Sequence, residues 1–351
     1  MKAVKLLLVL VFALIPFNSA FAAEKPLDAY FPMDMDIEEH WAYDEMEDLI
    51  NADIVDGFLN SDNEMYVKPK ENITRAQFVK IIVTALGLKS NGAGKTFPDV
   101  KTGVWYSEPI QIASSLGIIE GTPDGTFGPN KNITRAEMTK VIVNSFEKTI
   151  QFPSSGGKTF TDVSADYWAT EFISKAAAAE IVNGYGNEFK PKNLATRAEA
   201  MVMIHRALHQ EQSNLPADED IKAFLTDHIT RENAIVEAGK FEELAALYEE
   251  NGTGYYRAEG VELGGAMFPG EGEEVTITIE DENLNLDVLG KADRFVTVEA
   301  TGMMITVVYK SDGFNMDFTT EMDGIYDLKK DPVSGDWKIY SYYPLFAEEE
   351  F

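Results

Sequence analysis

Apolar residues recur with helical spacing in three segments of the first 210 residues. In each segment they fall at positions i, i+3, i+4 and i+7, which form one stripe of an amphipathic helix. The first stripe consists of Phe78, Ile81, Ile82 and Ala85. Similar stripes follow Thr134 and Thr196. A stripe of this width needs a partner, so we expect the three helices to bury their apolar faces against one another.

The same landmarks accompany each of these helices, about sixty residues apart along the chain. A Thr-Arg-Ala-Gln/Glu string begins each helix and contains Arg75, Arg135 or Arg197. Upstream lie the tryptophans Trp41, Trp105 and Trp168 and then the glycines Gly57, Gly121 and Gly184. These landmarks in one order predict three repeats of helix, loop and helix. We expect the first helix of each repeat to end at the glycine, as a left-handed cap.

The string at the start of each second helix has two interpretations. Thr-x-x-Glu/Gln is a capping box, which explains the threonines and the residues Gln77, Glu137 and Glu199. It does not explain the arginine, because a cation in the first turn faces the positive end of the helix dipole at a cost of about 0.3–1 kcal/mol. An anionic ligand would reverse that cost, since free backbone amides and a guanidinium both bind carboxylates. We therefore predict a cationic pocket at each of these helix starts.

The repeated tryptophan is also open to two interpretations. A tryptophan is usually a core residue, because its ring buries a large apolar area. Here each tryptophan is next to a polar aromatic or histidine neighbour, as in His40-Trp41 and Tyr167-Trp168. That setting equally favours stacking of the ring on a sugar face.

Together these landmarks resemble three tandem copies of the S-layer homology domain, over about residues 31–210. The second copy is most similar to the family, with Phe97–Val100 and Gly121–Pro129. The resemblance implies an all-α, pseudo-threefold bundle of three repeats. It also implies binding of a secondary cell-wall polysaccharide linked to peptidoglycan, often through a pyruvate-ketal amino sugar.

The resemblance assigns roles to the repeated residues. It implies that the arginines meet the pyruvyl carboxylate, that the tryptophans line the sugar groove, and that the backbone at the three glycines approaches the ligand. Glu137 and Glu199 are expected to cap the helix and orient the pocket. The first repeat departs from the pattern, with Gln77 in place of glutamate and a longer spacing from glycine to arginine.

The first 23 residues have the layout of a secretory signal peptide. Lys2 and Lys5 precede an apolar run over 6–15, and Ala20-Phe21-Ala22 is a small-x-small cleavage pattern. A run of ten apolar residues is too short to span about 30 Å of hydrocarbon. We therefore expect a secreted protein with no membrane span, located at the bacterial cell wall or S-layer surface. The expected domains are a signal peptide over 1–22, repeats over 30–90, 91–152 and 153–212, and an acidic domain over 215–351.

The last 140 residues have a different pattern. Helical stripes over 221–229 and 233–250 precede β-branched and aromatic runs from Val275 onward, which predicts an α+β domain with an antiparallel sheet. It weakly resembles the nuclear-transport-factor-like α+β cone, although we expect no third helix between Gly265 and Glu274. Tyr255–Arg257 could line a pocket mouth or be ordinary packing residues. His228 lies outside the predicted strands, so no catalytic pair is expected and a binding or structural domain is favoured. The alternative is a wall-anchored enzyme acting on a small molecule or wall metabolite.

The amino-acid composition limits the kinds of ligand and metal that the protein is expected to bind. With 30 Lys+Arg and 59 Asp+Glu the net charge is −29, which excludes nucleic-acid binding as a default. The absence of cysteine excludes a disulfide scaffold and a thiolate zinc site, and four histidines without a His-Glu-x-x-His pair disfavour a zinc hydrolase. We expect no cofactor and no metal centre. Residues 215–351 hold 31 acids and 10 bases, net −21, so divalent cations are a possible partner of this domain. Self-assembly is left open.

Overall fold

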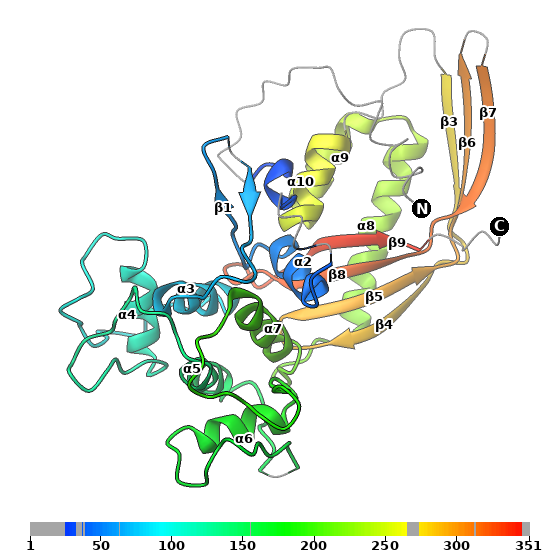
Figure 1. Cartoon of the computed structure of the whole chain (residues 1–351). Coiled ribbons are helices and arrows are strands. Elements are labelled where there is room, and N and C mark those ends of the chain that lie inside the picture. Colours follow the sequence, from blue (N-terminus) through cyan, green and yellow to red (C-terminus); the bar gives the residue numbers. More distant parts are fainter. Residues whose placement is uncertain are drawn as a thin grey trace.

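The computed structural model describes residues 25–32, 37, 39–62, 64–154, 156–264, 274–311 and 314–345. The expected signal peptide lies outside these residues. The repeats form one region of the molecule, and a helical and sheet region follows it in the chain (Figure 1). The elements of the first region are η1 (Leu27–Tyr30), α2 (Tyr43–Asn51), β1 (Phe58–Leu59), β2 (Met65–Tyr66), α3 (Arg75–Ala85), α4 (Ser107–Ser115), α5 (Arg135–Phe146), α6 (Thr170–Ala178) and α7 (Arg197–Leu208).

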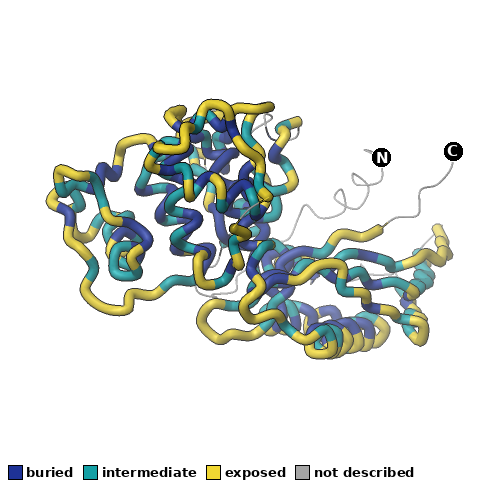
Figure 2. The backbone as a smooth tube through the Cα atoms, turned by 90° about the horizontal axis from the view of Figure 1, so that it is seen from below, coloured by how far each residue is buried: buried dark blue, intermediate teal, exposed yellow. Residues whose placement is uncertain are grey.

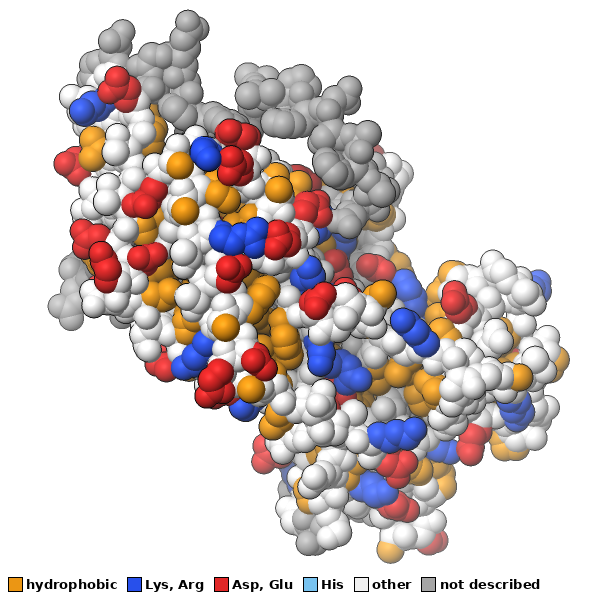
Figure 3. Space-filling view, turned by 180° about the vertical axis from the view of Figure 1, so that it is seen from behind, with side chains coloured by type: hydrophobic (Ala, Val, Ile, Leu, Met, Phe, Trp, Pro, Cys, Tyr) orange, Lys and Arg blue, Asp and Glu red, His pale blue; other side chains and the backbone are white. Residues whose placement is uncertain are grey.

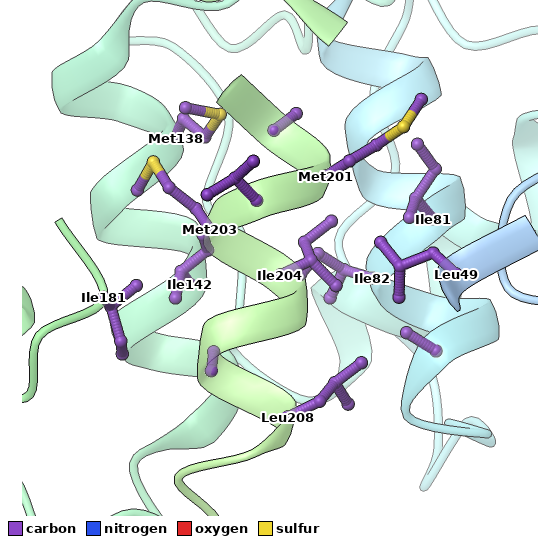
Figure 4. Close-up of a cluster of buried hydrophobic side chains, with 14 of the residues drawn as sticks. Leu49, Ile81, Ile82, Met138, Ile142, Ile181, Met201, Met203, Ile204 and Leu208 are labelled. Atoms are coloured by element: carbon purple, nitrogen blue, oxygen red, sulfur yellow. The ribbon is translucent and has the colours of Figure 1, made fainter. Parts of the chain in front are cut away.

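The second helix of each repeat begins as the sequence predicts. Thr74, Thr134 and Thr196 are the N-caps of α3, α5 and α7, and each makes a complete capping box with Gln77, Glu137 or Glu199. The apolar stripe of α3 is buried along its whole length. Figure 4 shows α7 between α5 and α3, with Met203 facing Met138 on one side and Ile204 facing Ile82 on the other. The three stripes therefore share one core.

The first helix of each repeat ends earlier than predicted. Helices α2, α4 and α6 end at Asn51, Ser115 and Ala178. Two residues later the backbone is left-handed, at Asp53 (φ 54°), Gly117 (φ 75°) and Glu180 (φ 58°). The amide of the residue that follows bonds back to the helix, for example Ile54 N–H to the Leu49 carbonyl at 2.9 Å, as in a Schellman cap. The prediction that Gly57, Gly121 and Gly184 end these helices is wrong.

The repeats interlock in a closed order rather than a row. Helix α3 of the first repeat packs against α4 of the second, α5 packs against α6, and α7 returns to α2. The segments before the second helices hydrogen-bond in a ring: Ile73 donates to Ala195, Ala195 to Ile133, and Ile133 to Ile73, at 2.9–3.0 Å. The short β1–β2 hairpin makes this region mainly helical, not all-α as expected.

The C-terminal region is an α+β domain, as predicted. Its elements are α8 (Asp218–Glu237), η2 (Phe241–Glu243), α9 (Leu244–Asn251), α10 (Gly254–Leu263), β3 (Glu274–Glu280), β4 (Asn285–Lys291), β5 (Phe295–Thr301), β6 (Met304–Ser311), β7 (Phe314–Glu321), β8 (Gly324–Lys330) and β9 (Trp337–Pro344). All strand pairs are antiparallel, in two sheets of order β3-β6-β7 and β4-β5-β8-β9. The three-stranded sheet lies far from α4 and α6 (Figure 1).

Two elements of this domain were not predicted. Helix α10 ends before residues 265–273, and the expected absence of a helix there lies outside the described residues. Strand β4 was not expected, because its sequence NLDVLGK lacks a β-branched run. No helix in the described part of the chain is long and apolar enough to cross a membrane.

The repeats and the C-terminal domain share a core. Ala258 of α10, Phe295 of β5 and Tyr340 of β9 belong to the same buried cluster as the central helices of the repeats. Tyr340 is 2% exposed, and its hydroxyl donates to Asp48 of α2 at 2.6 Å. Figure 2 shows buried backbone where the two regions meet. The repeats and the C-terminal domain therefore pack as one body.

Candidate functional site

The three repeated tryptophans are all on the surface. Trp41, Trp105 and Trp168 are 63%, 56% and 52% exposed, although each ring could bury a large apolar area. Each ring contacts the neighbouring His40, Tyr106 or Tyr167, with centroids 5.1–5.6 Å apart. The core interpretation of these residues is wrong, and an exposed ring held by a neighbour is suited to stacking on a ligand.

One groove combines predicted residues from all three repeats. It has a volume of about 190 Å³ and is lined by Gly57 and Gln77 of the first repeat, Trp105 of the second and Arg197 of the third. Lys80 of α3 also lines it and pairs with Asp56 at 3.0 Å. This groove exists only because the repeats pack in a ring.

A second groove is lined by the same kinds of residue, each supplied by the preceding repeat of the ring. Its volume is about 310 Å³, and its lining includes Gly184 and Glu199 of the third repeat, Trp41 of the first and Arg135 of the second. The remaining predicted residues are Arg75, Glu137, Gly121 and Trp168. Among them, Arg75 and Glu137 form the same ion pair between repeats, at 3.0 Å.

Each arginine is fixed to the repeat that follows it in the ring. The Nε atoms of Arg75, Arg135 and Arg197 donate to the carbonyls of Phe127, Phe189 and Val67 at 2.7–2.8 Å. The guanidinium of Arg135 lies over the Tyr185 and Phe189 rings, 5.0 and 4.8 Å from their centroids. The arginine thus also has a structural role, in holding neighbouring repeats together.

The two carboxylate oxygens of Glu199 have different partners, one in the helix cap and one in the groove. Its Oε2 accepts the Thr196 backbone N–H at 2.9 Å, and its Oε1 lies 2.5 Å from Arg135 NH1. The Tyr185 hydroxyl also donates to Oε1, and burial followed by this bond raises the pKa of Tyr185, so the hydroxyl remains protonated. In the first repeat Gln77 completes the cap with a neutral amide.

The repeated glycines are required by close packing. A Cβ on Gly121 or Gly184 would lie 2.4 Å from the ring of Phe97 or Phe160, and both glycines have positive φ. A Cβ on Gly57 would lie 2.2 Å from the Met65 sulfur. Gly57 and Gly184 also line the two grooves, so their bare backbone faces the space a ligand would enter.

Two aspartates of the repeat pattern acquire a role that the sequence did not reveal. Asp99 accepts the backbone N–H groups of Phe127 and Gly128 at 2.9 and 2.7 Å, and Asp162 does the same for Phe189 and Lys190. Burial acts to raise the pKa of each carboxyl, but these hydrogen bonds outweigh it and lower the pKa. The aspartates therefore hold the loop whose carbonyl receives the arginine.

Three segments of the chain match a known protein family. The S-layer homology domain family matches residues 36–79, 96–139 and 159–201. The chain contains three S-layer homology domains. These domains hold every arginine, tryptophan and glycine of the predicted site, and the ring of repeats described above is built from them.

The enzymes among the relatives share only this region. The amylopullulanase of Thermoanaerobacterium thermosulfurigenes is 37% identical over 56% of this chain and 10% of its own length, within the S-layer homology region. The cellulosome-anchoring protein of Acetivibrio thermocellus is 35% identical over 42% of this chain and 34% of its own length. The surface-layer 125 kDa protein of Lysinibacillus sphaericus is 27% identical over 82% of this chain and 23% of its own length. The chain thus spans between 10% and 34% of the length of these relatives.

A solved structure of the intermembrane space region of the chloroplast protein ARC6 aligns with 38% of this chain and 98% of its own. The TM-score is 0.30 and the identity 14%, which is too low a likeness to assign a fold. The resemblance of the C-terminal domain to a cone stays a prediction.

His228 of the C-terminal domain lies in a buried polar cluster. It has no exposed surface, its Nε2 lies 2.7 Å from the Tyr256 hydroxyl, and its Nδ1 lies 3.2 Å from Asn251. Burial, followed by the charge of Arg231, lowers the pKa of His228 to about 4, so the ring is neutral. Tyr256 is therefore a packing residue rather than part of a pocket mouth, and both ring nitrogens of His228 have partners.

Proposed function

We propose that this is a secreted surface protein, held non-covalently at the bacterial cell wall by its three S-layer homology domains. The observation that carries the proposal is the repeated association of an exposed tryptophan with an arginine groove at the junction of three repeats. The names of the relatives, a surface-layer protein and a cellulosome-anchoring protein among them, support the same location.

The ligand is a secondary cell-wall polysaccharide carrying pyruvate-ketal groups. A sugar face would stack on the tryptophan ring, and the ketal carboxylate would bind the guanidinium and nearby helix amides. The ring of hydrogen bonds through Ile73, Ala195 and Ile133 supports a pseudo-threefold bundle with up to three equivalent grooves. We further propose that the three domains span residues 30–90, 91–152 and 153–212.

The groove that holds Gln77 differs from the other groove in the charge of one lining residue. In the other groove, Glu199 already binds the guanidinium of Arg135. Gln77 takes the equivalent place beside Arg197 and contributes no charge. A ligand carboxylate in the first groove would therefore meet no carboxylate at the position that Glu199 holds in the other groove.

Residues 215–351 are the displayed domain, with a binding or structural role. On the face shown in Figure 3, acidic side chains are spread over this domain, while Lys and Arg gather mainly on the repeats. Because the domain shares a core with the repeats, it is presented in a fixed orientation to the wall.

The test is binding of the mature protein to purified wall sacculi, with Trp41→Ala combined with Trp105→Ala. Both rings are more than half exposed, so the variant should keep its unfolding temperature and lose most of its wall binding. Val333→Ala, at a 79% exposed position in the C-terminal domain, is the matched control and should bind normally. Unchanged binding of the tryptophan variant would contradict the proposal.

A further inference from the structure

Three side chains of types that commonly bind metal ions meet where the repeats contact the C-terminal sheet. Asp48 lies on α2, while His205 and His209 lie one turn apart around the end of α7. One ligand atom of each residue lies within 4.8 Å of the others. None of the three lines either of the grooves proposed for polysaccharide.

The two carboxylate oxygens of Asp48 have different surroundings, and one of them faces the histidines. Oδ1 accepts the hydroxyl of the buried Tyr340 at 2.6 Å. Oδ2 is buried and faces His205 Nε2 at 3.0 Å, and no other described residue hydrogen-bonds to it. This distance is short enough for the oxygen and the nitrogen to share one metal ion, since ligand bonds of about 2.0–2.2 Å place neighbouring ligand atoms slightly farther apart.

The second histidine is oriented by its own helix. His209 Nδ1 lies 2.8 Å from the backbone carbonyl of His205, which can only accept, so Nδ1 carries the proton. The lone pair is then on Nε2, which is the arrangement that backbone carbonyls impose on metal-binding imidazoles. The ring is also fixed by contacts with the His205 ring, 4.2 Å away, and the Phe295 ring, 5.3 Å away.

We propose that Asp48, His205 and His209 bind a divalent transition-metal ion, with zinc as the best fit. Two imidazole nitrogens and one carboxylate oxygen, with water in the fourth position, are a common zinc ligand set. Calcium requires six to eight oxygen ligands and magnesium an octahedral oxygen shell, so neither fits this set.

The ion would stabilise the joint between the anchor and the displayed domain. Asp48 belongs to the first repeat and the histidines to the third, so the ion closes the ring of repeats. Through Tyr340 of β9, the same carboxylate contacts the C-terminal sheet. Two histidines four residues apart are a weak signal of this site in the sequence, and the carboxylate lies in a distant helix.

The experiment is thermal unfolding of the mature chain, first treated with chelator, in the presence of Zn²⁺, Ca²⁺ or Mg²⁺. Zn²⁺ should raise the unfolding temperature, because an ion at a 100-fold excess over its Kd shifts the folding equilibrium about 100-fold. Chelator should reverse the rise, and Ca²⁺ and Mg²⁺ should not produce it. His209→Gln should lose at least tenfold in zinc affinity, while the control His40→Gln, at a histidine outside the cluster, should retain it.

Co²⁺ provides a measurement that needs no variant. Binding at the proposed site should give the visible absorption bands of a four-coordinate ion, and one equivalent of Zn²⁺ should remove them. Absence of both the bands and the zinc-dependent stabilisation would overturn the proposal and leave Asp48 and His205 as an ordinary ion pair. Equal zinc affinity of the His209→Gln variant would overturn it as well.

Discussion

At the scale of single residues, the arginine that begins each second helix is the most informative. The sequence indicated that a cation in the first helical turn needs a negative partner. The structure supplies part of that partner from inside the protein, because Glu137 and Glu199 of the following repeat bind Arg75 and Arg135. This could not be predicted from the chain, since it depends on which repeats become neighbours in space.

The substitution Gln77→Glu tests the anionic ligand at this scale. Glutamate keeps the capping box, as in the other repeats, but adds a carboxylate beside Arg197. We expect stability to be unchanged within about 0.5 kcal/mol and wall binding to weaken severalfold, as measured by sedimentation with sacculi. Gln111→Glu, at an exposed position on α4, adds the same charge elsewhere and should have little effect. Equal binding by both variants would show that Arg197 does not meet an anion.

The aspartates Asp99 and Asp162 predict a pH dependence of stability. Their pKa is lower in the folded protein, so their contribution is present above the ordinary carboxyl pKa of about 4 and is lost as the pH falls through the folded value. The Asp99→Asn variant should lose less stability on acidification than the natural protein. Denaturant titrations from pH 7 to pH 2 would measure the free energy of unfolding of both proteins. A variant with the acid sensitivity of the natural protein would contradict the role of these hydrogen bonds.

At the scale of elements, the second helices were predicted well and the first helices less well. Thr74, Thr134 and Thr196 define a capping box that is local in sequence. The ends of α2 and α6 have no such signal, because aspartate and glutamate occupy left-handed positions that usually hold glycine. Strand β4 was missed for a related reason, since its pairing with β5 rather than its own sequence makes it a strand.

The left-handed position after α6 yields a stability prediction. Glu180 has φ 58° and is exposed, so Glu180→Gly should relieve about 1 kcal/mol of backbone strain. Chemical denaturation would measure the gain in the free energy of unfolding. Glu180→Ala removes the same charge but retains a Cβ, so it should give no gain. Equal stability of the glycine and alanine variants would contradict the assignment of this cap.

At the scale of the whole molecule, the repeats and the C-terminal domain share one buried core. The sequence predicted two regions, and both exist, but it gave no indication that they share a core. Phe295 and Tyr340 belong to strands far along the chain and yet pack with the helices of the repeats. An amphipathic stripe shows that a partner is needed but does not identify the partner.

This shared core predicts cooperative unfolding. Phe295→Ala, in the C-terminal sheet, should destabilise the protein by about 3–5 kcal/mol and should lower the unfolding temperature of the repeats as well. Hydrogen exchange read separately for residues 41–208 and 218–345 would measure both parts. Two independent transitions in the natural protein, or a loss confined to the C-terminal part in the variant, would contradict a common core.

The most direct test of wall anchoring is sedimentation of the mature protein with purified sacculi, before and after the secondary polysaccharide is removed by acid. The exposed tryptophans and the arginine grooves predict that the protein sediments with intact sacculi and stays in solution with stripped ones. Protein that sediments equally with both preparations would contradict a polysaccharide ligand.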